Sequence, residues 1–263
     1  MLRVELTTQM LRARTLTALA GLAAVPVVAG LATASHAGHR DGNQGGLFGA
    51  ATYSALNHTM ASLDFTAPLL LPLAVAMLAS AVGSADRAWG TLRYLYVQPV
   101  NRSRLLAGKL AAVLVITAAA TGCVLAAGFF TGLALFGWHA FHVIGAPSLP
   151  EADAVGRCLA AAGYTLLCML SIGAITFALG LLLPHGAEAL GASLALVIAG
   201  SILSAHQHNL ATYLPMYYWQ DWATLFEPAG TAHLGAGIAA QAAAITAAAG
   251  VSVLVLVRRD PAA

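Results

Sequence analysis

The chain has 263 residues, of which 59% are hydrophobic and only 8% are charged, and its net charge is +2. Soluble domains carry about 25% charged residues, so this composition excludes a soluble fold that hides its apolar surface in one core. The small net charge says nothing about nucleic acid, but the sequence has no Lys or Arg run of the density that such binding needs, so we expect no nucleic-acid partner. The composition therefore predicts a protein that lies in the lipid bilayer.

Six apolar stretches are long enough to cross a bilayer as helices, at about 1.5 Å of rise per residue. The expected spans are 15–35, 65–85, 110–136, 158–183, 187–205 and 232–257. None alternates like a barrel strand, so we expect an all-α, polytopic membrane protein with six transmembrane helices in one domain, 1–263. Pro184, His185 and Gly186 separate the fourth and fifth spans and predict an antiparallel hairpin there.

Basic residues predict the orientation, because short loops rich in Lys and Arg stay in the cytoplasm. If both termini are cytoplasmic, ten of the twelve basic residues lie on that side, and only Arg40 and Arg157 lie outside. An odd number of spans would remove this bias. We therefore expect a multi-pass protein of the plasma membrane, of the bacterial inner-membrane type, with cytoplasmic N and C termini.

The first apolar stretch also has a second interpretation. Arg12 and Arg14, the apolar run and Ser35-His36-Ala37 imitate a cleavable signal peptide with a small-residue site. Cleavage would leave five spans and an external N-terminus. The run 15–35 is longer than the apolar core of a usual signal peptide, which favours an uncleaved first span.

Two segments are expected on the external side. Residues 36–64 contain Gly, His and Asn without clear periodicity and are expected to form a loop, in which Asn57-His58-Thr59 is interpreted as a chance match to a glycosylation acceptor. Residues 206–228 are rich in aromatic side chains around Pro215, and such amphipathic rings suit the headgroup level of a membrane. We expect this second segment to form short re-entrant helices in the outer leaflet.

The stretch from Asp86 to Lys109 is the most informative part of the sequence. Trp89, Leu92 and Tyr96 follow each other at helical spacing, and Pro99 ends the pattern. This predicts a short amphipathic helix over 86–96 at the cytoplasmic face, followed by a basic turn into the third span. Such a helix transmits force from a soluble partner or only anchors the bundle in the interface, and the pattern alone leaves both readings open.

This stretch resembles the signature of the type-2 ATP-binding-cassette (ABC) transporter permeases, which has an acidic residue before Gly-Thr-Leu, then Pro-Val-x-Arg and Leu-Leu-x-Gly-Lys. The matching positions here are Asp86, Gly90, Thr91, Leu92, Pro99, Arg102 and Lys109. The N-terminal segment with Glu5 and Arg12 is similar to the amphipathic entry helix of that family, and 206–228 resembles its external re-entrant helices. The chain departs from the pattern at Asp86, where Glu is usual, and at Gln98 before the proline.

The resemblance implies a permease subunit that pairs with a second copy or a paralogue and docks two copies of a cytoplasmic ABC ATPase subunit. The entry helix and the coupling helix over 86–96 would contact that ATPase. The sequence has no phosphate-binding Gly-rich loop ending in Lys-Ser or Lys-Thr. We therefore expect no cofactor and no enzymatic activity in this chain itself, and expect ATP and magnesium to be used by the partner.

The spans have almost no ionisable group near a midplane, whereas ion-coupled carriers usually need one. This favours an ATP-driven path for a lipophilic or amphipathic compound. The resemblance suggests export, although the cargo itself is not readable. Gly128 and Gly132 form a GxxxG pattern for close helix approach, either inside one bundle or between subunits.

Nine histidines invite a metal hypothesis. His139 with His142, and His206 with His208, have spacings that can share zinc or copper outside the membrane, but a third ligand and a structural frame are missing. Two other functions compete with transport. An intramembrane protease or transferase needs a paired Ser and His or an HExxH motif, and neither occurs. A non-transporting anchor or sensor of the same fold remains open.

Overall fold

The computed structural model describes residues 7, 9–36, 51–88, 102–143, 148–206, 212, 214–226 and 233–258, and in this part the chain is all-helical apart from turns and one isolated bridge between Phe141 and Leu149. The elements are α2 Ala13–His36, α3 Ala55–Thr66, α4 Leu70–Ala88, α6 Arg102–Phe136, α7 Glu151–Leu182, α8 Gly186–His206, η2 Pro215–Tyr218, η3 Asp221–Phe226 and α10 Leu234–Arg258. The expected all-α class is confirmed for these residues.

Five of the helices, namely α2, α6, α7, α8 and α10, are long and apolar enough to cross a membrane. A sixth crossing exists if α3 and α4, which meet at 62°, count as one broken span. Pro68 and Pro72 explain the break, because proline has no backbone N–H that could donate to the carbonyl oxygen one helical turn earlier. Pro72 cannot donate to the carbonyl oxygen of Pro68, which accepts a hydrogen bond of 3.5 Å from the Ser201 hydroxyl of α8.

Helix α3 corrects one expectation, because the sequence analysis placed 36–64 in a loop and the expected second span began only at 65. Ser54 caps the helix by accepting the Asn57 backbone N–H at 3.3 Å. Most residues of α3 are buried, including Asn57 and His58. The segment looked like a loop because its polar residues face protein rather than lipid, which hides the helix from a hydropathy pattern.

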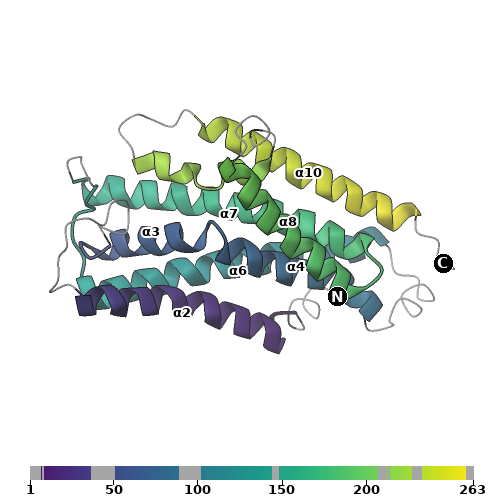
Figure 1. Ribbon diagram of the computed structural model, residues 1–263, viewed down its shortest axis with the longest axis horizontal. Helices are drawn as coiled ribbons and strands as arrows, with labels where there is room; N and C mark the ends of the chain where they lie inside the picture. The colour runs from purple at the N-terminus through teal and green to yellow at the C-terminus, as the bar shows by residue number, and fades with distance from the viewer. Residues whose placement is uncertain are drawn as a thin grey trace.

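Helices α6 and α7 form the centre of the bundle (Figure 1). α7 packs against α4, α6, α8 and α10, and α6 packs against α2, α3 and α4. In the view of Figure 1, α2 and α10 lie at opposite edges of the molecule. The start of α2 and the end of α10 lie toward the same end of the long axis, which we call the terminal end, and the opposite end is called the cap end.

Glycines set the closest helix contact, which is the crossing of α4 and α7. A Cβ atom on Gly83 would lie 2.5 Å from the carbonyl oxygen of Phe177, and a Cβ on Gly180 would overlap the carbonyl oxygen of Ser80. The two backbones therefore touch without intervening side chains, as small residues allow in membrane helix pairs. This contact holds the centre of the bundle together at the terminal end.

Candidate functional site

The terminal end carries the residues that the resemblance assigns to ATPase coupling. Glu5, Gly90, Thr91, Leu92 and Pro99 lie outside the described residues, together with most of the expected coupling helix over 86–96. Asp86 falls in the last turn of α4 and Arg102 begins α6, but their side chains are also outside what the structure describes. Both helix ends point to the end of the bundle where α2 begins and α10 ends (Figure 1).

Lys109 is the signature residue that the structure places in full. Its side chain is 3% exposed, and its Nζ donates a hydrogen bond of 3.3 Å to the Val82 carbonyl oxygen of α4. A buried ammonium needs such partners, because an isolated charge is costly away from water. Lys109 thus joins α6 to α4 directly above the two helix ends that flank the signature.

Arg12 lies at the start of α2. Its carbonyl oxygen accepts the backbone N–H groups of Thr15, at 2.9 Å, and Leu16, at 3.1 Å. The Thr15 hydroxyl donates to the Gln9 carbonyl oxygen at 2.8 Å. These bonds turn the residues before α2 back onto the helix, so the expected entry segment is tied to the bundle at its described end.

Gly128 and Gly132 lie against α3 of the same chain. A Cβ on Gly128 would lie 3.2 Å from the Cα of Thr59, and a Cβ on Gly132 would lie 2.9 Å from the Cα of Ala55. The GxxxG pattern therefore serves packing inside one bundle in this structure. The helix that packs against these glycines is α3, which lies mostly in the segment that the sequence analysis had interpreted as a loop.

Asn57 and His58 are buried polar residues to which the sequence analysis assigned no role beyond a chance motif match. The Asn57 amide donates to the His142 carbonyl oxygen at 2.7 Å and accepts the His142 N–H at 3.0 Å, so the matched acceptor asparagine is buried and bonded to protein. His58 Nε2 lies 3.1 Å from the Pro26 carbonyl oxygen of α2. Polar residues in a segment next to apolar spans were the available signal for both.

The cap end is covered by η2, η3 and the turn that joins them, which together we call the aromatic cap. Its side chains Met216, Tyr218, Trp219, Trp222 and Phe226 are buried. This agrees with the expectation of short helices in 206–228, of which the structure describes 212 and 214–226 and the backbone of His206. The cap is therefore a packed part of the bundle rather than a free connection.

Hydrogen bonds fix the aromatic cap to α7 and α10. Tyr164 donates to the Tyr218 carbonyl oxygen at 2.9 Å, and Arg157 Nη1 donates to the Leu225 carbonyl oxygen at 2.8 Å. Gln241 is fully buried in α10, where its Nε2 donates to the Pro215 carbonyl oxygen at 2.7 Å and its Oε1 accepts the Ser171 hydroxyl of α7. Gln241 thus holds three elements at one point.

The aromatic cap contains one unusual carboxyl. The Oδ2 atom of Asp221 is buried and has no hydrogen-bond partner. Burial raises the pKa of the Asp221 carboxyl above its ordinary value, and the nearby His233 opposes this only in part. The rise in the pKa is the larger of the two effects, and its cause is the loss of water around the charged carboxylate.

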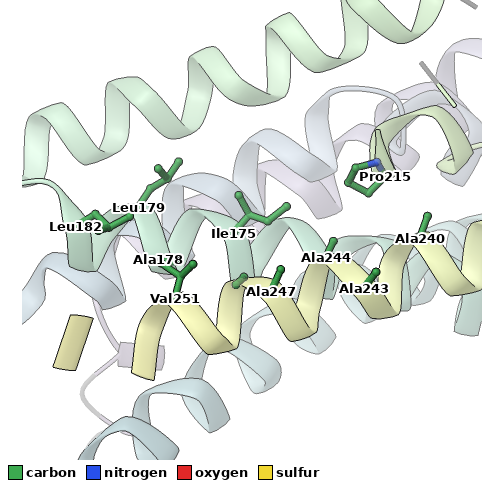
Figure 2. Close-up of a pocket in the computed structure, with 11 residues that line it drawn as sticks. Ile175, Ala178, Leu179, Leu182, Pro215, Ala240, Ala243, Ala244, Ala247 and Val251 are labelled. Atoms are coloured by element: carbon green, nitrogen blue, oxygen red, sulfur yellow. The ribbon is translucent and has the colours of Figure 1, made fainter. Parts of the chain in front are cut away.

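An open apolar groove of about 530 Å³ runs between α7 and α10 (Figure 2). Ile175, Ala178, Leu179 and Leu182 line it from α7, alanines and Val251 line it from α10, and Pro215 of the cap lies near one end. The volume falls in the range of small-molecule pockets, roughly 300–1,000 Å³. Its lining offers hydrocarbon contacts to whatever occupies it.

The structure brings no metal site together among the residues it describes. No group of three or more His, Cys, Asp or Glu side chains there could hold an ion. His142 instead stacks on Tyr53, with ring centroids 4.3 Å apart. His139 lies in the described loop after α6, the side chain of His206 is not described, and His208 lies outside the described residues.

Comparison with known families gives one match. A family model called DUF2705, described as a protein of unknown function, matches residues 42–220. The chain belongs to this family. The matched region of the DUF2705 family runs from the residues before α3 to the aromatic cap, so it contains Asn57, His58, Gly128 and the segment between α4 and α6. No curated protein matches the chain.

Proposed function

We propose that this chain is the membrane-spanning subunit of an ATP-driven transporter of the type-2 ABC kind, and that a separate ATPase supplies the energy. The observation that carries the proposal is the segment from Asp86 to Lys109. In the sequence, the segment joins the end of α4 to the first turns of α6, and these two helix ends lie at the same end of the bundle as the start of α2 and the end of α10. A soluble partner docked at that end would reach both the entry segment and the coupling segment.

The arrangement above the signature suits a mechanical role. Lys109 joins α6 to α4 through the Val82 carbonyl, and α4 touches α7 backbone to backbone at Gly83 and Gly180. A push on the connection between α4 and α6 would therefore reach the central helices through rigid contacts. Packed elements of this kind move as bodies rather than deform, which is how rigid-body switches work.

In this proposal the chain crosses the plasma membrane six times, with α3 and α4 as one broken span and with both termini in the cytoplasm. It pairs with a second copy or a paralogue above two ATPase subunits, and the aromatic cap lies in the outer leaflet. The apolar groove between α7 and α10 supports a lipophilic or amphipathic cargo, and we propose export because of the family resemblance. ATP and magnesium act on the ATPase subunit.

Co-purification tests the proposal. The tagged chain, extracted in a mild detergent, is expected to bring down a water-soluble ATPase that carries the phosphate-binding loop. The variant Arg102→Glu should reduce the recovered ATPase by about tenfold or more, because reversing a charge at a docking contact opposes association. Arg104→Glu makes the same change two residues later, outside the signature, and should retain the partner.

Reconstitution separates transport from the rival functions. Vesicles with the chain and its ATPase should show nucleotide-dependent solute movement, and vesicles with the chain alone should show none. If no ATPase is recovered with the wild-type chain, the transporter proposal fails and a membrane anchor or enzyme takes its place. Equal recovery with Arg102→Glu and Arg104→Glu would show that the coupling contact has been assigned to the wrong residues.

A further inference from the structure

The apolar groove between α7 and α10 lies beside the contact that holds these two helices together. Ala174 and Ala178 of α7 form one buried cluster with Ala248 of α10. Ala178 and Ala248 also line the groove, so they form its floor. Its rims are exposed, since Leu182 is 43% and Val251 is 38% exposed. The groove therefore opens to the outside of the bundle (Figure 2).

The surroundings of the groove are apolar on every side. Both helices that form its walls, α7 and α10, are long and apolar enough to cross a membrane. None of the eleven lining side chains has a hydrogen-bond donor or acceptor. In the membrane-spanning arrangement, the groove opens onto the acyl chains of lipids, which fill the hydrocarbon core of a bilayer.

The dimensions of the groove limit what can enter it. Its lining on α10 runs from Ala240 to Val251, which is about 17 Å at a rise of ~1.5 Å per residue. This is close to the depth of one leaflet, since the hydrocarbon core is about 30 Å thick. A volume of about 530 Å³ spread over that length leaves a mean width of about 6 Å, whereas an α-helix with its side chains is about 10–12 Å wide. The groove is thus too narrow for a helix to enter.

The chemistry of the lining decides between the narrower occupants. An extended polypeptide would have peptide groups that need hydrogen-bond partners away from water, and no lining side chain supplies one. A hydrocarbon chain has no such need. An empty groove is unfavourable too, because lining atoms without neighbours lose dispersion contacts. The acyl chains of the surrounding lipid are the molecules that restore these contacts.

The two ends of the groove differ in polarity. Toward the cap end, it stops near Pro215 of the aromatic cap. Toward the terminal end, Leu182 is the last residue of α7, and the ion pair of His185 and Glu188 follows it, with side chains 75% and 51% exposed. At this same end α10 continues past the groove and ends at Arg258. An amphipathic molecule with its tail toward the cap and its charged head at the terminal end fits this arrangement.

We propose that the groove binds one acyl chain of a membrane phospholipid from the leaflet at the terminal end. The tail points toward Pro215, and the headgroup lies at the level of His185 and Arg258. Binding needs neither the ATPase nor nucleotide, so this proposal and the proposed transport can each fail alone. A lipophilic cargo that uses the same groove would have to displace the bound chain.

Photocrosslinking in vesicles tests the proposal. The chain without any ATPase is reconstituted into phosphatidylcholine vesicles that contain a small fraction of phosphatidylcholine with a diazirine on one acyl chain. One probe carries the diazirine at the end of the tail, and a second carries it next to the glycerol. After illumination, peptide mass spectrometry measures the labelling of each residue on α10.

The expected pattern compares groove residues with exposed residues of the same helix at similar depth. The tail-end probe should label Ala240 at least about fivefold more than Ile238, and the glycerol-side probe should label Val251 more than Val253 by the same factor. A fivefold excess corresponds to a preference of about 1 kcal/mol for the groove over the lipid-facing surface. Equal labelling of groove and lipid-facing residues, or a tail-end probe that labels Val251 rather than Ala240, would overturn the proposal.

Two matched double variants separate the groove from general contact with lipid. Ala243→Leu with Ala247→Leu places larger side chains in the groove at exposed positions, so the protein should fold and the excess labelling should disappear. Ala239→Leu with Ala242→Leu makes the same change at exposed positions of α10 that do not line the groove, and should keep the excess. If the filled groove is labelled like the wild type, or if the control loses the excess as well, the proposal is wrong.

Discussion

The central and the peripheral helices of this bundle are almost equally hydrophobic but differ sharply in burial. α7 has a mean hydropathy of 2.2 and is 61% buried over its most apolar window, whereas α10 has a mean hydropathy of 1.9 and is 17% buried. Hydropathy therefore indicates which helices can cross a membrane. It does not indicate which of them lie inside, because lipid is as apolar as a protein core.

Small and polar residues make the difference between the two regions. At the centre, glycines let α4 touch α7 and let α6 touch α3. On the periphery, Gly21 of α2 and Gly250 of α10 have nothing within 4 Å of their Cβ positions. The same residue type is thus a helix contact at some positions and open surface at others, which gives matched pairs for mutation.

The largest effect is expected at the crossing of α4 and α7. Gly180→Leu forces a side chain into the backbone of α4, so we expect it to cost about 3 kcal/mol or more or to prevent folding, in the range of severe overpacking. The fraction of monodisperse protein and its Tm in detergent measure this. The atoms nearest to the Cβ position of Gly180 belong to the backbone of α4, which cannot move aside as the end of a flexible side chain could.

Gly250→Leu is the matched change on α10. Its Cβ position is open, and leucine has a better helix propensity than glycine by about 0.8 kcal/mol, so the variant should fold as well as the wild type or slightly better. A loss of stability comparable to that of Gly180→Leu would show that the outer face of α10 is covered. The central and peripheral helices would then not differ in the way described above.

A smaller effect is expected at Gln241, the point where a peripheral helix behaves like a central one. Gln241→Leu removes the bonds to Ser171 and to the Pro215 carbonyl and leaves the carbonyl buried without that donor. We expect a loss of about 1–3 kcal/mol, the cost of an unsatisfied buried polar group. Tm and the tryptophan fluorescence of the aromatic cap report the change.

Thr246→Val serves as the control for Gln241→Leu on the same helix. The Thr246 hydroxyl is exposed and bonds to the Ala242 carbonyl of its own helix at 2.8 Å, so its loss should stay within about 0.5 kcal/mol. Equal Tm values for the two variants would mean that Gln241 does not hold the cap on α10.

Hydropathy and charge predicted the helical class and the existence of the long apolar helices, because those features depend on residues facing lipid. The expected third and fourth spans began later than their helices do: α6 begins at Arg102 and α7 at Glu151, since polar first turns extend beyond the apolar run. Helix α3 was missed for the opposite reason. Its polar residues point into protein, where a pattern built on lipid exposure has no signal.

The candidate site divides in the same way. Short signatures indicated Lys109 and the glycines of α6, whose roles depend on local spacing. The Gln241 contact and the Asn57 bonds to His142 join residues that are far apart in the sequence, and only the packing brings them together. A polar residue within an apolar run is the sole sequence signal for such positions.

The smallest effect is expected at Asp221, which lies in the cap outside the membrane-spanning segments. Its carboxyl has a folded-state pKa above the ordinary value of 3.8 because burial disfavours the charge. Between those two pKa values the folded state binds more protons than the unfolded state, so stability falls as the pH rises through that window and stays low above it. Asp221→Asn removes the buried charge and should raise the Tm at neutral pH.

The gain from Asp221→Asn should shrink as the pH is lowered toward 4, because the wild-type carboxyl then becomes neutral too. We expect the gain at neutral pH to stay below about 1 kcal/mol, since water screens a partly exposed group. Tm values of both proteins from pH 4 to pH 8 measure it, with Glu188→Gln as an exposed control at the opposite end of the bundle. A gain in Tm that does not vary with pH would mean that hydrogen bonds of the new amide, rather than the loss of the charge, stabilise the variant. The cap would then be held by buried polar contacts, as Gln241 holds α10.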